Sequence, residues 1–325
     1  MKLKIHFFLF TILVIGLSCD PDDDDGIIQV PEADRTEQQI IDNDSLLAFL
    51  QTHYINESLV LNNTSLSLND IEIINLPEDG ELPNPDENSL LIDIVETHTT
   101  TYFDVEYEFY ILTLNQGGSE ISPNFSDKVR VSYEGSLADE TVFDSSESPV
   151  DFDLTSTIAG WGRVLPEFNN AIDFNINDDG TVNYNDPGVG IMFLPSGLGY
   201  YSSAAGSVPV YSNLIFKFKV YQSEFNDHDF DNVPSHLEDL DNDYDLADDN
   251  SDDDSFANFV DSDDDNDGTL TIDEDLEPDT DLTVDRDGDG DPTNDIGDGD
   301  PTNDDTDGDG IPNYLDSDDT ASRND

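Results

Sequence analysis

The chain has 325 residues, of which 77 are acidic and only 10 are lysine or arginine, so its formal net charge at pH 7 is −67. Such a charge repels phosphate groups and excludes nucleic acid as a partner. A single cysteine, Cys19, excludes an intramolecular disulfide. Hydrophobic residues make up 35% of the chain, which is enough for one good core but not for a globular structure throughout.

The chain opens with an export signal. Lys2 and Lys4 precede an apolar run from Phe7 to Leu17. Because this run is shorter than the ~20 apolar residues of a membrane-spanning helix, residues 1–18 are predicted to be a signal peptide. "VIGLSC" resembles the lipobox of bacterial lipoproteins. The resemblance implies that Cys19 becomes the lipidated first residue and the membrane anchor.

An acidic linker is predicted next, over residues 19–36. It begins "CDPDDDD", and an acidic run directly after the lipidated cysteine resembles the surface-export signal of lipoproteins in Bacteroidota-type bacteria. Charge repulsion in a solvated linker would give the same run. The expected location is the bacterial cell envelope, as an outer-membrane lipoprotein, with exposure at the cell surface as a further expectation.

The region from residue 37 to 114 is predicted to contain a helix and strands. In "TEQQIIDNDSLLAFLQTH" apolar side chains fall at roughly helical spacing, at Ile40, Ile41, Leu47, Phe49 and Leu50. From Leu59 to Pro85 the chain is predicted to be loop with at most short strands. "YFDVEYEFYILTL", Tyr102 to Leu114, alternates aromatic and acidic residues as a half-buried strand does.

Two further strands and a helix are predicted in residues 115–222. "KVRVSYEGSL" (128–137) and "SNLIFKFKVYQ" (212–222) alternate apolar and polar residues, so each has one buried face. "GRVLPEFNNAI" spaces apolar residues as a helix does, with Pro166 in its first turn. The expected fold class is α+β, with an antiparallel sheet packed on a short helix.

Short motifs follow one another in a fixed order in this region: "VRVSYEGSL", "VFDSS", "FDLTSTIAGW", a short helix, "MFLPSGLGYY" and "SVPVYSNLIFKFKV". The order resembles that of the FKBP-type peptidyl-prolyl cis-trans isomerases, whose antiparallel sheet wraps around a short helix. The resemblance implies an isomerase domain over residues 115–222. Its proline pocket would be formed by Tyr133, Phe143, Asp144, Phe152, Ile158, Trp161, Tyr200, Val208 and Phe216.

The resemblance also implies roles for these residues. Trp161, the only tryptophan of the chain, would form the floor of the pocket, between aromatic walls. Ile158 would offer its backbone N–H to the substrate carbonyl, Tyr200 would supply a hydroxyl donor, and Asp144 would polarise the site. Rotation about an X–Pro bond makes and breaks no covalent bond. No nucleophile and no catalytic cofactor are therefore expected.

Three features leave alternatives open. Tyr201 stands where the family has glycine, and "DFNINDDGTVNYNDPGVG" is an acidic insertion that either screens the site or lengthens a hairpin. Aromatic residues around a tryptophan also fill ordinary cores. A pocket that binds proline without turnover, in a chaperone or an adhesion module, therefore remains an alternative to an isomerase.

Residues 223–325 are rich in aspartate, with too few hydrophobic residues for a core. Four segments nevertheless share one 12-residue frame: 227–238, 250–261, 263–274 and 305–316. Oxygen ligands fall at positions 1, 3, 5 and 12, which is the spacing of a calcium loop. The predicted ligands are Asp227, Asp229, Asp231, Glu238, Asp263, Asp265, Asp267, Glu274, Asp305, Asp307, Asp309 and Asp316.

These loops lack long flanking helices and resemble the thrombospondin type-3 calcium repeats of bacterial surface proteins. The resemblance implies an irregular tail in which Ca²⁺ replaces a hydrophobic core, although disorder would also suit the composition. A calcium-stiffened surface module with the globular region as a spacer is a second alternative. The expected partners are proline-containing polypeptides and, through Cys19, a membrane. The sequence does not indicate an oligomeric state.

Overall fold

The computed structural model describes residues 32–61, 63, 66–276 and 300–322. The predicted signal peptide, Cys19 and most of the acidic linker lie outside the described residues. Among the residues described, no helix combines the length and the apolar character needed to cross a membrane.

The first element is the helix α1 (Arg35–Thr52), and the Asp34 side chain caps it by accepting a hydrogen bond from the Glu37 N–H. The helix lies where the sequence predicts it, but its buried face was predicted wrongly in part. Ile40 and Ile41 are each 60% exposed. The packed face instead carries polar side chains together with apolar ones: Gln38, Gln39, Asp42, Leu46, Phe49 and Leu50.

Asp42 explains why polar residues occupy that face. Its carboxylate accepts hydrogen bonds from the Ser196 N–H (2.8 Å), the Ser196 hydroxyl (2.6 Å) and the Gln38 amide (2.7 Å). The Asn213 amide donates to the Asp42 carbonyl at 2.9 Å. Because buried polar groups are stable when they are paired, this network attaches α1 to the turn at Ser196. Apolar spacing alone could not predict it.

Short elements follow α1: β1 (His53–Ile55), α2 (Glu57–Val60), the 3₁₀ turn Leu68–Asp70, β2 (Ile74–Asn75), β3 (Ser89–Leu90) and α3 (Leu91–Ile94). The three strands form a small antiparallel sheet in the order β2-β1-β3. The described residues between 59 and 85 therefore contain little regular structure, as the sequence predicts.

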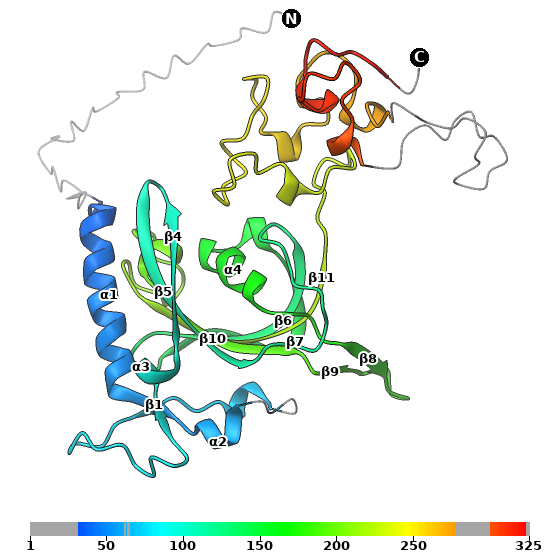
Figure 1. Cartoon of the computed structure of the whole chain (residues 1–325). Coiled ribbons are helices and arrows are strands. Elements are labelled where there is room, and N and C mark those ends of the chain that lie inside the picture. The colour runs from blue at the N-terminus through cyan, green and yellow to red at the C-terminus, as the bar shows by residue number, and fades with distance from the viewer. Residues whose placement is uncertain (1–31, 62, 64–65, 277–299, 323–325) are drawn as a thin grey trace, which may run out of the picture. The chain divides into compact units, whose positions relative to one another are not determined.

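The main sheet is antiparallel, with six strands in the order β4-β5-β10-β11-β6-β7. Its strands are β4 (Glu96–Tyr102), β5 (Val105–Asn115), β6 (Lys128–Ser136), β7 (Val142–Asp153), β10 (Gly188–Leu194) and β11 (Leu214–Glu224). Figure 1 shows this sheet curving around the short helix α4 (Ala159–Val164). The predicted antiparallel sheet with a short helix is confirmed.

The single strand predicted over residues 102–114 is wrong at its start. Phe103 and Asp104 have φ values of +49° and +58°, so they form the two-residue turn between β4 and β5. Tyr102 thus ends one strand and Val105 begins the next. Because β5 pairs with β10, the main sheet also extends before residue 115.

The helix predicted over residues 162–172 is also partly wrong. The observed α4 begins at Ala159 and is followed by a 3₁₀ turn at Leu165–Glu167. Pro166 lies in that turn, because proline lacks the N–H that would continue an α-helix. Ile172 is outside the helix and 60% exposed.

The acidic insertion forms a second hairpin, β8 (Asp173–Ile176) and β9 (Val182–Asn185), which Figure 1 shows projecting from the end of the main sheet. It therefore extends a connection between α4 and β10. At its base the Tyr184 ring packs on the Tyr221 ring, with centroids 4.5 Å apart.

Both faces of the main sheet are buried. On one face Phe216, Phe218 and Val220 of β11 pack with Trp161 and Val164 of α4. On the other face alternate residues of β5 and β10 pack with α1: Tyr110, Leu112, Leu114, Val189, Ile191 and Phe193. The two cores share the sheet, so the N-terminal helix covers the face opposite α4.

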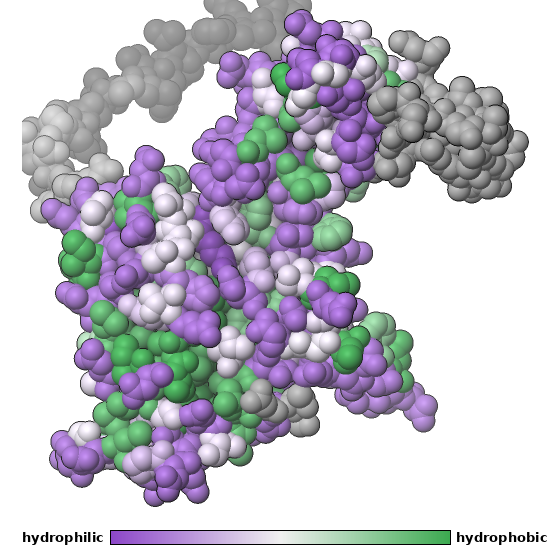
Figure 2. Space-filling view, viewed as in Figure 1, coloured by the Kyte–Doolittle hydropathy of each residue, from purple (hydrophilic) through white to green (hydrophobic). Residues whose placement is uncertain are grey.

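In residues 223–276 and 300–322, the described parts of the Asp-rich segment, the regular structure after β11 consists of short 3₁₀ turns at Ser235–Leu237, Asn258–Val260, Thr271–Asp273, Pro301–Asn303 and Asn313–Leu315. Figure 2 shows mostly hydrophilic residues on the visible face of this segment. Its buried apolar residues include Val233, Leu246 and Tyr314. Turns and buried carboxylates therefore take the place of a conventional core here.

Candidate functional site

An aromatic cup lies between the sheet and α4. We use this name for eight of the nine residues predicted for a proline pocket, which the structure brings into one cluster. Four of them are at most 9% exposed: Tyr133, Trp161, Val208 and Phe216. Phe143, Phe152, Ile158 and Tyr200 are partly buried and pack against these. The cup thus has a buried floor and a partly exposed rim.

Trp161 is at the centre of this cluster and 4% exposed. Its ring lies 5.0 Å from Phe216, 5.6 Å from Phe152 and 5.9 Å from Tyr133, measured between centroids. The tilted and edge-to-face geometries are those that aromatic rings favour. The indole therefore forms a rigid floor held by rings from β6, β7 and β11.

Gly135 leaves room for this arrangement. A Cβ atom at residue 135 would lie 2.6 Å from the Phe216 ring and 2.7 Å from the Phe143 ring. The glycine of "SYEG" is therefore needed because two rings of the cup occupy the space above the backbone.

Asp144, the ninth predicted residue, lies on the exposed side of β7 and reaches the cup through Tyr133. The Tyr133 hydroxyl donates a hydrogen bond to Asp144 Oδ2 at 2.6 Å. Burial, followed by the hydrogen bond to Asp144 and its charge, raises the pKa of Tyr133. Burial and the Asp144 charge also raise the pKa of Tyr200. Both phenols therefore remain protonated donors at neutral pH.

Two donors at the rim are unused. Ile158 is the residue before the first turn of α4, and its carbonyl accepts the Trp161 N–H at 3.1 Å. Within the described part of the chain, neither the Ile158 N–H nor the Tyr200 hydroxyl has a hydrogen-bond partner. Each can therefore donate to a bound carbonyl without breaking an existing bond.

Tyr201 takes the backbone conformation that usually requires glycine. Its φ is +48°, and its N–H donates to the Ser196 carbonyl at 2.9 Å. Its hydroxyl donates to the Ala33 carbonyl, and the Arg35 guanidinium lies 4.0 Å from the ring centroid. These contacts with the start of α1 stabilise the strained backbone of Tyr201. The turn can therefore form with tyrosine at the position where the resembled family has glycine.

The Asp-rich segment provides a second candidate site. We call residues 227–238 the first loop, 250–261 the second, 263–274 the third and 305–316 the last. The ninth residue of each loop donates its N–H to the carbonyl of the residue before the loop. The side chain of the ninth residue also accepts a hydrogen bond, from the N–H of the second residue of the same loop. These ninth residues are all buried: Ser235, Asn258, Thr271 and Asn313.

The loops also turn in the same way. The fourth residue has a positive φ in all four, at Phe230, Asp253, Asn266 and Gly308. The aspartate at position 5 accepts the N–H of the seventh residue with one oxygen, at Asp231, Asp254, Asp267 and Asp309. The shared frame therefore corresponds to a shared local structure, although the four loops differ in sequence.

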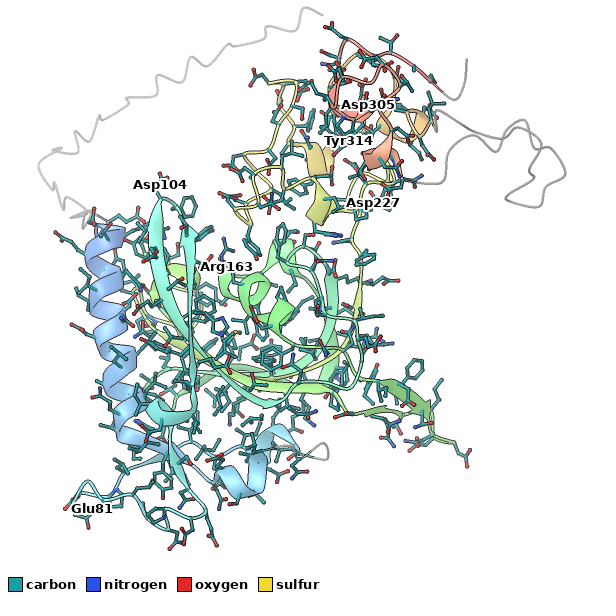
Figure 3. The ribbon with its side chains drawn as sticks, in the orientation of Figure 1. Glu81, Asp104, Arg163, Asp227, Asp305 and Tyr314 are labelled. Atoms are coloured by element: carbon teal, nitrogen blue, oxygen red, sulfur yellow. The ribbon has the colours of Figure 1, made fainter. Side chains whose placement is uncertain are left out.

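Carboxylate oxygens gather inside these loops, within 4.8 Å of one another in each group. One group is formed by Asp227, Asp229 and Asp231, and another by Asp263, Asp265 and Asp267. Of the last loop, Figure 3 labels Asp305 and the buried Tyr314. Asp305 accepts the N–H groups of Gly308 and Gly310.

Several acidic side chains of this segment are almost completely buried and carry oxygens without a hydrogen-bond partner. Glu238 and Glu274 are 0% exposed, and all four of their carboxylate oxygens lack a hydrogen-bond partner. Burial and neighbouring carboxylates raise the pKa of Glu238 to about 10 and that of Glu274 to about 9. Burial raises the pKa of Asp264 to about 9. Buried carboxylate oxygens without a hydrogen-bond partner are suitable ligands for a hard divalent cation.

The 12-residue spacing did not predict one further loop. Asp239, Asp241 and Asp249 form another carboxylate group, in which Asp239 accepts the N–H groups of Asp243 and Tyr244. Asn242 and Tyr244 have positive φ values, as at positions 4 and 6 of the first, third and last loops. The Asp-x-Asp-x-Asp spacing at 239–243 was the available signal, but no carboxylate follows at position 12.

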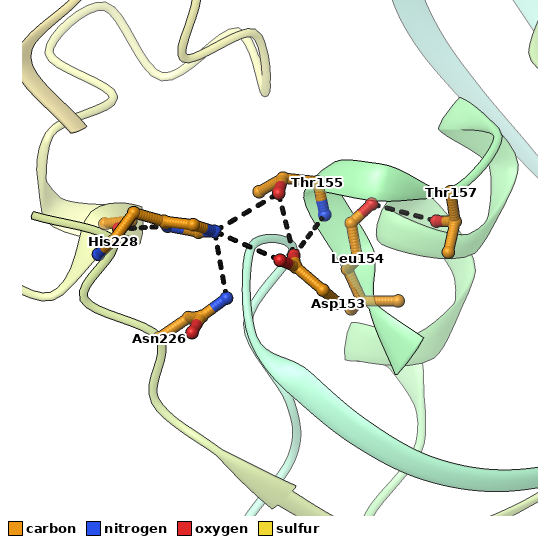
Figure 4. A network of polar contacts seen from close by, with 7 residues as sticks. Asp153, Leu154, Thr155, Thr157, Asn226 and His228 are labelled. Carbon is orange, nitrogen blue, oxygen red and sulfur yellow. Dashed lines mark hydrogen bonds and ion pairs between the residues drawn. The ribbon is translucent and has the colours of Figure 1, made fainter. Parts of the chain in front are cut away.

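His228 joins the first loop to the isomerase-like region (Figure 4). Its Nε2 atom lies 3.3 Å from Asp153 Oδ2 and 3.3 Å from the Thr155 hydroxyl, and its Nδ1 atom lies 2.8 Å from the Ser235 hydroxyl. Asp153 caps the 3₁₀ turn Leu154–Ser156, which precedes Ile158. The first loop thus contacts the segment that leads to the rim of the cup.

Part of the chain is similar to a known protein family. Residues 119–221 match the family model described as FKBP-type peptidyl-prolyl cis-trans isomerase. This segment contains all the residues of the cup. It excludes α1 and the Asp-rich segment.

Three curated proteins are similar to the same region. The FKBP-type peptidyl-prolyl cis-trans isomerase FkpA of Aeromonas hydrophila is 32% identical over 121 residues, which are 36% of this chain and 38% of that protein. The FKBP-type 22 kDa peptidyl-prolyl cis-trans isomerase of Escherichia coli (strain K12) is 31% identical over 113 residues, 34% and 47% of the two chains. The peptidyl-prolyl cis-trans isomerase Mip of Coxiella burnetii is 47% identical over 53 residues, 15% and 23% of the two chains. The chain thus matches less than half the length of these relatives.

Two solved structures are also similar. A peptidyl-prolyl cis-trans isomerase from Pseudomonas syringae shares 23% identity with a TM-score of 0.30, over 36% of this chain and 75% of its own. FkpA from Escherichia coli shares 23% identity with a TM-score of 0.31, over 40% of this chain and 52% of its own.

Proposed function

We propose that residues 119–221, which match the model of the FKBP-type peptidyl-prolyl cis-trans isomerases, form an isomerase domain. Through this domain the chain catalyses the rotation of X–Pro bonds in exported polypeptides at the cell envelope. The observation that carries the proposal is the aromatic cup, which brings together the buried Trp161 ring and two unused donors, the Ile158 N–H and the Tyr200 hydroxyl. The cup offers an apolar surface for a proline ring and hydrogen bonds for a carbonyl.

The reaction requires only preferential binding of a twisted imide. Rotation about an X–Pro bond is opposed by a barrier of about 18–20 kcal/mol, which arises from the double-bond character of the C–N bond. At the twisted geometry this resonance is lost. Removing water from the imide and binding the twisted state more tightly than either planar state both lower the barrier.

Different residues of the cup exclude water from the imide and bind its twisted state. The floor and walls receive the pyrrolidine ring and exclude water, because Trp161, Phe216 and Tyr133 are buried and packed against one another. The Ile158 N–H donates to the substrate carbonyl. The Tyr200 hydroxyl donates from the opposite rim. Asp144 is a positioning residue, since it fixes the Tyr133 hydroxyl by accepting a hydrogen bond of 2.6 Å from it.

Tyr200→Phe tests the donor at the rim. We expect it to lower kcat/KM for a proline tetrapeptide about tenfold, because one hydrogen bond to the twisted state is lost. The control is Tyr184→Phe, which removes a hydroxyl from another partly buried tyrosine, on the β8–β9 hairpin. It should leave kcat/KM unchanged. The measurement is peptide isomerisation followed by NMR exchange.

The same assay separates catalysis from binding alone. If wild-type protein binds the peptide but gives no rate above the uncatalysed exchange, the cup is a proline-binding module and the enzyme proposal is wrong. If both tyrosine variants lose activity equally, Tyr200 has no special role.

We further propose that Cys19 carries a lipid that anchors the mature protein to the outer membrane, with its bulk at the cell surface. The basic start, the apolar run and "VIGLSC" support this proposal. In cells grown with a clickable fatty acid, the wild-type protein should be labelled and found with membranes. Cys19→Ser should lose the label and leave the membrane fraction. Labelling of the serine variant would contradict the proposed anchor.

For the Asp-rich segment we propose Ca²⁺ binding by the predicted ligands. The support is the clustering of carboxylate oxygens within 4.8 Å in the first and third loops, together with the orphaned oxygens of Glu238 and Glu274. All these donors are hard oxygens, which Ca²⁺ prefers. Extracellular modules of this kind bind Ca²⁺ with Kd values of about 10⁻⁴–10⁻³ M, so the loops would be filled outside the cell.

A further inference from the structure

A third carboxylate group joins two loops that are separate in the sequence. It consists of Asp231 and Glu238 of the first loop and Asp264 of the third, and their carboxylate oxygens lie within 4.8 Å of one another. Asp264 stands at the second position of its loop, outside the frame that defines the predicted ligands. Its side chain therefore points away from the group formed by its neighbours Asp263, Asp265 and Asp267.

All three side chains are buried and aimed at the same place. Asp231 and Glu238 are 0% exposed, and Asp264 is 1% exposed. One oxygen of Asp231, one of Asp264 and both of Glu238 have no hydrogen-bond partner. The second oxygen of Asp231 accepts the Val233 N–H, and that of Asp264 accepts the Thr271 hydroxyl. Four buried acceptor oxygens of this group thus have no donor in the described part of the chain.

In the described part of the chain, no basic side chain pairs with this group. Residues 226–276 contain no lysine and no arginine. Among the described residues no ion pair reaches Asp231, Glu238 or Asp264. Buried carboxylates that lack such partners are found where a metal ion binds.

The distances suit calcium. Two oxygens on opposite sides of one Ca²⁺ are about 4.6–5.2 Å apart, since each Ca–O bond is about 2.3–2.6 Å long. Three oxygens within 4.8 Å of one another can therefore reach the same ion. Asp231 also belongs to the group with Asp227 and Asp229, so it lies between two neighbouring positions for ions.

We propose that Asp231, Glu238 and Asp264 hold one Ca²⁺ between the first and third loops, so that this ion ties the two loops together. The inference rests on the proposal that the Asp-rich segment binds Ca²⁺, and it adds a ligand and a site that the 12-residue frame does not contain. Each loop then depends on the other, and the segment folds as one unit.

Asp264→Asn in the full-length protein tests the shared site. Asparagine keeps the shape and the bond from Thr271 but removes the charge. We expect one fewer tightly bound Ca²⁺, with at least tenfold weaker affinity at that site, by calcium titration and native mass spectrometry. The matched control is Asp253→Asn, which makes the same charge change at an exposed residue of the second loop. Its φ of +61° suits asparagine. It should keep every ion.

A second measurement reports on the contact between loops. Phe230 of the first loop is 79% exposed and can be cleaved by chymotrypsin. In the presence of Ca²⁺, Asp264→Asn should increase cleavage at Phe230 severalfold, although the substitution is in the third loop. Glu238→Gln should remove the same single ion, and the double variant should lose no further ion.

The outcomes separate this inference from the calcium proposal itself. A wild-type protein that binds no Ca²⁺ at millimolar concentration would overturn both. A wild-type protein that binds Ca²⁺, together with an Asp264→Asn variant that matches Asp253→Asn in ion count, affinity and Phe230 cleavage, would overturn only the shared site.

Discussion

Replacing Trp161 with alanine is expected to reduce kcat/KM for X–Pro isomerisation at least 100-fold and to destabilise the domain by about 3–5 kcal/mol. The indole is 4% exposed and packs on the rings of Tyr133, Phe152 and Phe216. Without it the floor of the cup becomes a cavity, and the pyrrolidine ring loses the surface against which it is desolvated. The measurement is NMR exchange of a proline peptide, with stability from urea unfolding.

Because this variant loses stability as well as activity, it is compared with a substitution elsewhere in the same core. Phe168 is 0% exposed and packs edge to face on Phe218, outside the cup. Trp161→Leu should be folded but inactive, whereas Phe168→Leu should be destabilised but active below its unfolding temperature. Equal activity of the two leucine variants would show that the indole only fills the core.

The uniqueness of Trp161 provides a direct binding assay. No other tryptophan contributes to fluorescence, so a change in emission on adding a proline peptide reports occupancy of the cup. Tyr200→Phe should keep this signal, because it retains the rings. Binding and turnover can therefore be measured separately on the same protein.

The strands of the sheet could be predicted because their sequence pattern is local, whereas the residues of the cup were predicted from the resemblance to a family. In β11 every second residue is apolar, and Leu214, Phe216, Phe218 and Val220 all face the core as expected. The same alternation places Tyr133 of β6 on that side. A one-residue error in register would have turned each of these side chains to the opposite face.

Features that depend on distant parts of the chain could not be predicted in this way. Ile40 and Ile41 are exposed because Asp42 takes the packed face of α1, and its partner Ser196 is far along the sequence. The turn at Phe103 and Asp104 lacks the glycine or asparagine that usually marks two-residue hairpins. Their positive φ values could therefore not be read from the residues themselves.

In the acidic loops, too, local features could be predicted and contacts between distant residues could not. The 12-residue frame predicts which carboxylates of one loop gather, and Asp227, Asp229 and Asp231 do so. It does not predict that Asp264 belongs with Asp231 and Glu238, since a frame describes spacing within one loop only. The pairing of the ninth and second residues is equally hidden, because serine, asparagine and threonine all serve at the ninth position.

Removing calcium is expected to unfold the Asp-rich segment while the isomerase domain stays folded. A Ca²⁺ site with a Kd of about 10⁻⁴ M contributes about 1.8 kcal/mol at about 2 mM Ca²⁺, and several sites act together. After chelation the buried carboxylates of Glu238, Asp264 and Glu274 would have to be protonated or exposed to water. With no lysine or arginine between residues 226 and 276, mutual repulsion then favours an expanded chain.

Chymotrypsin cleavage and small-angle scattering measure this expansion. With EGTA we expect rapid cleavage at Phe230 and Phe256, which are 79% and 56% exposed, and a larger radius of gyration, both reversed by Ca²⁺. The emission of Trp161 serves as the internal control, since it reports on the isomerase domain and should not change. A radius and a cleavage pattern that are the same with EGTA and with Ca²⁺ would contradict the proposal, because the described loops would then be stable without an ion.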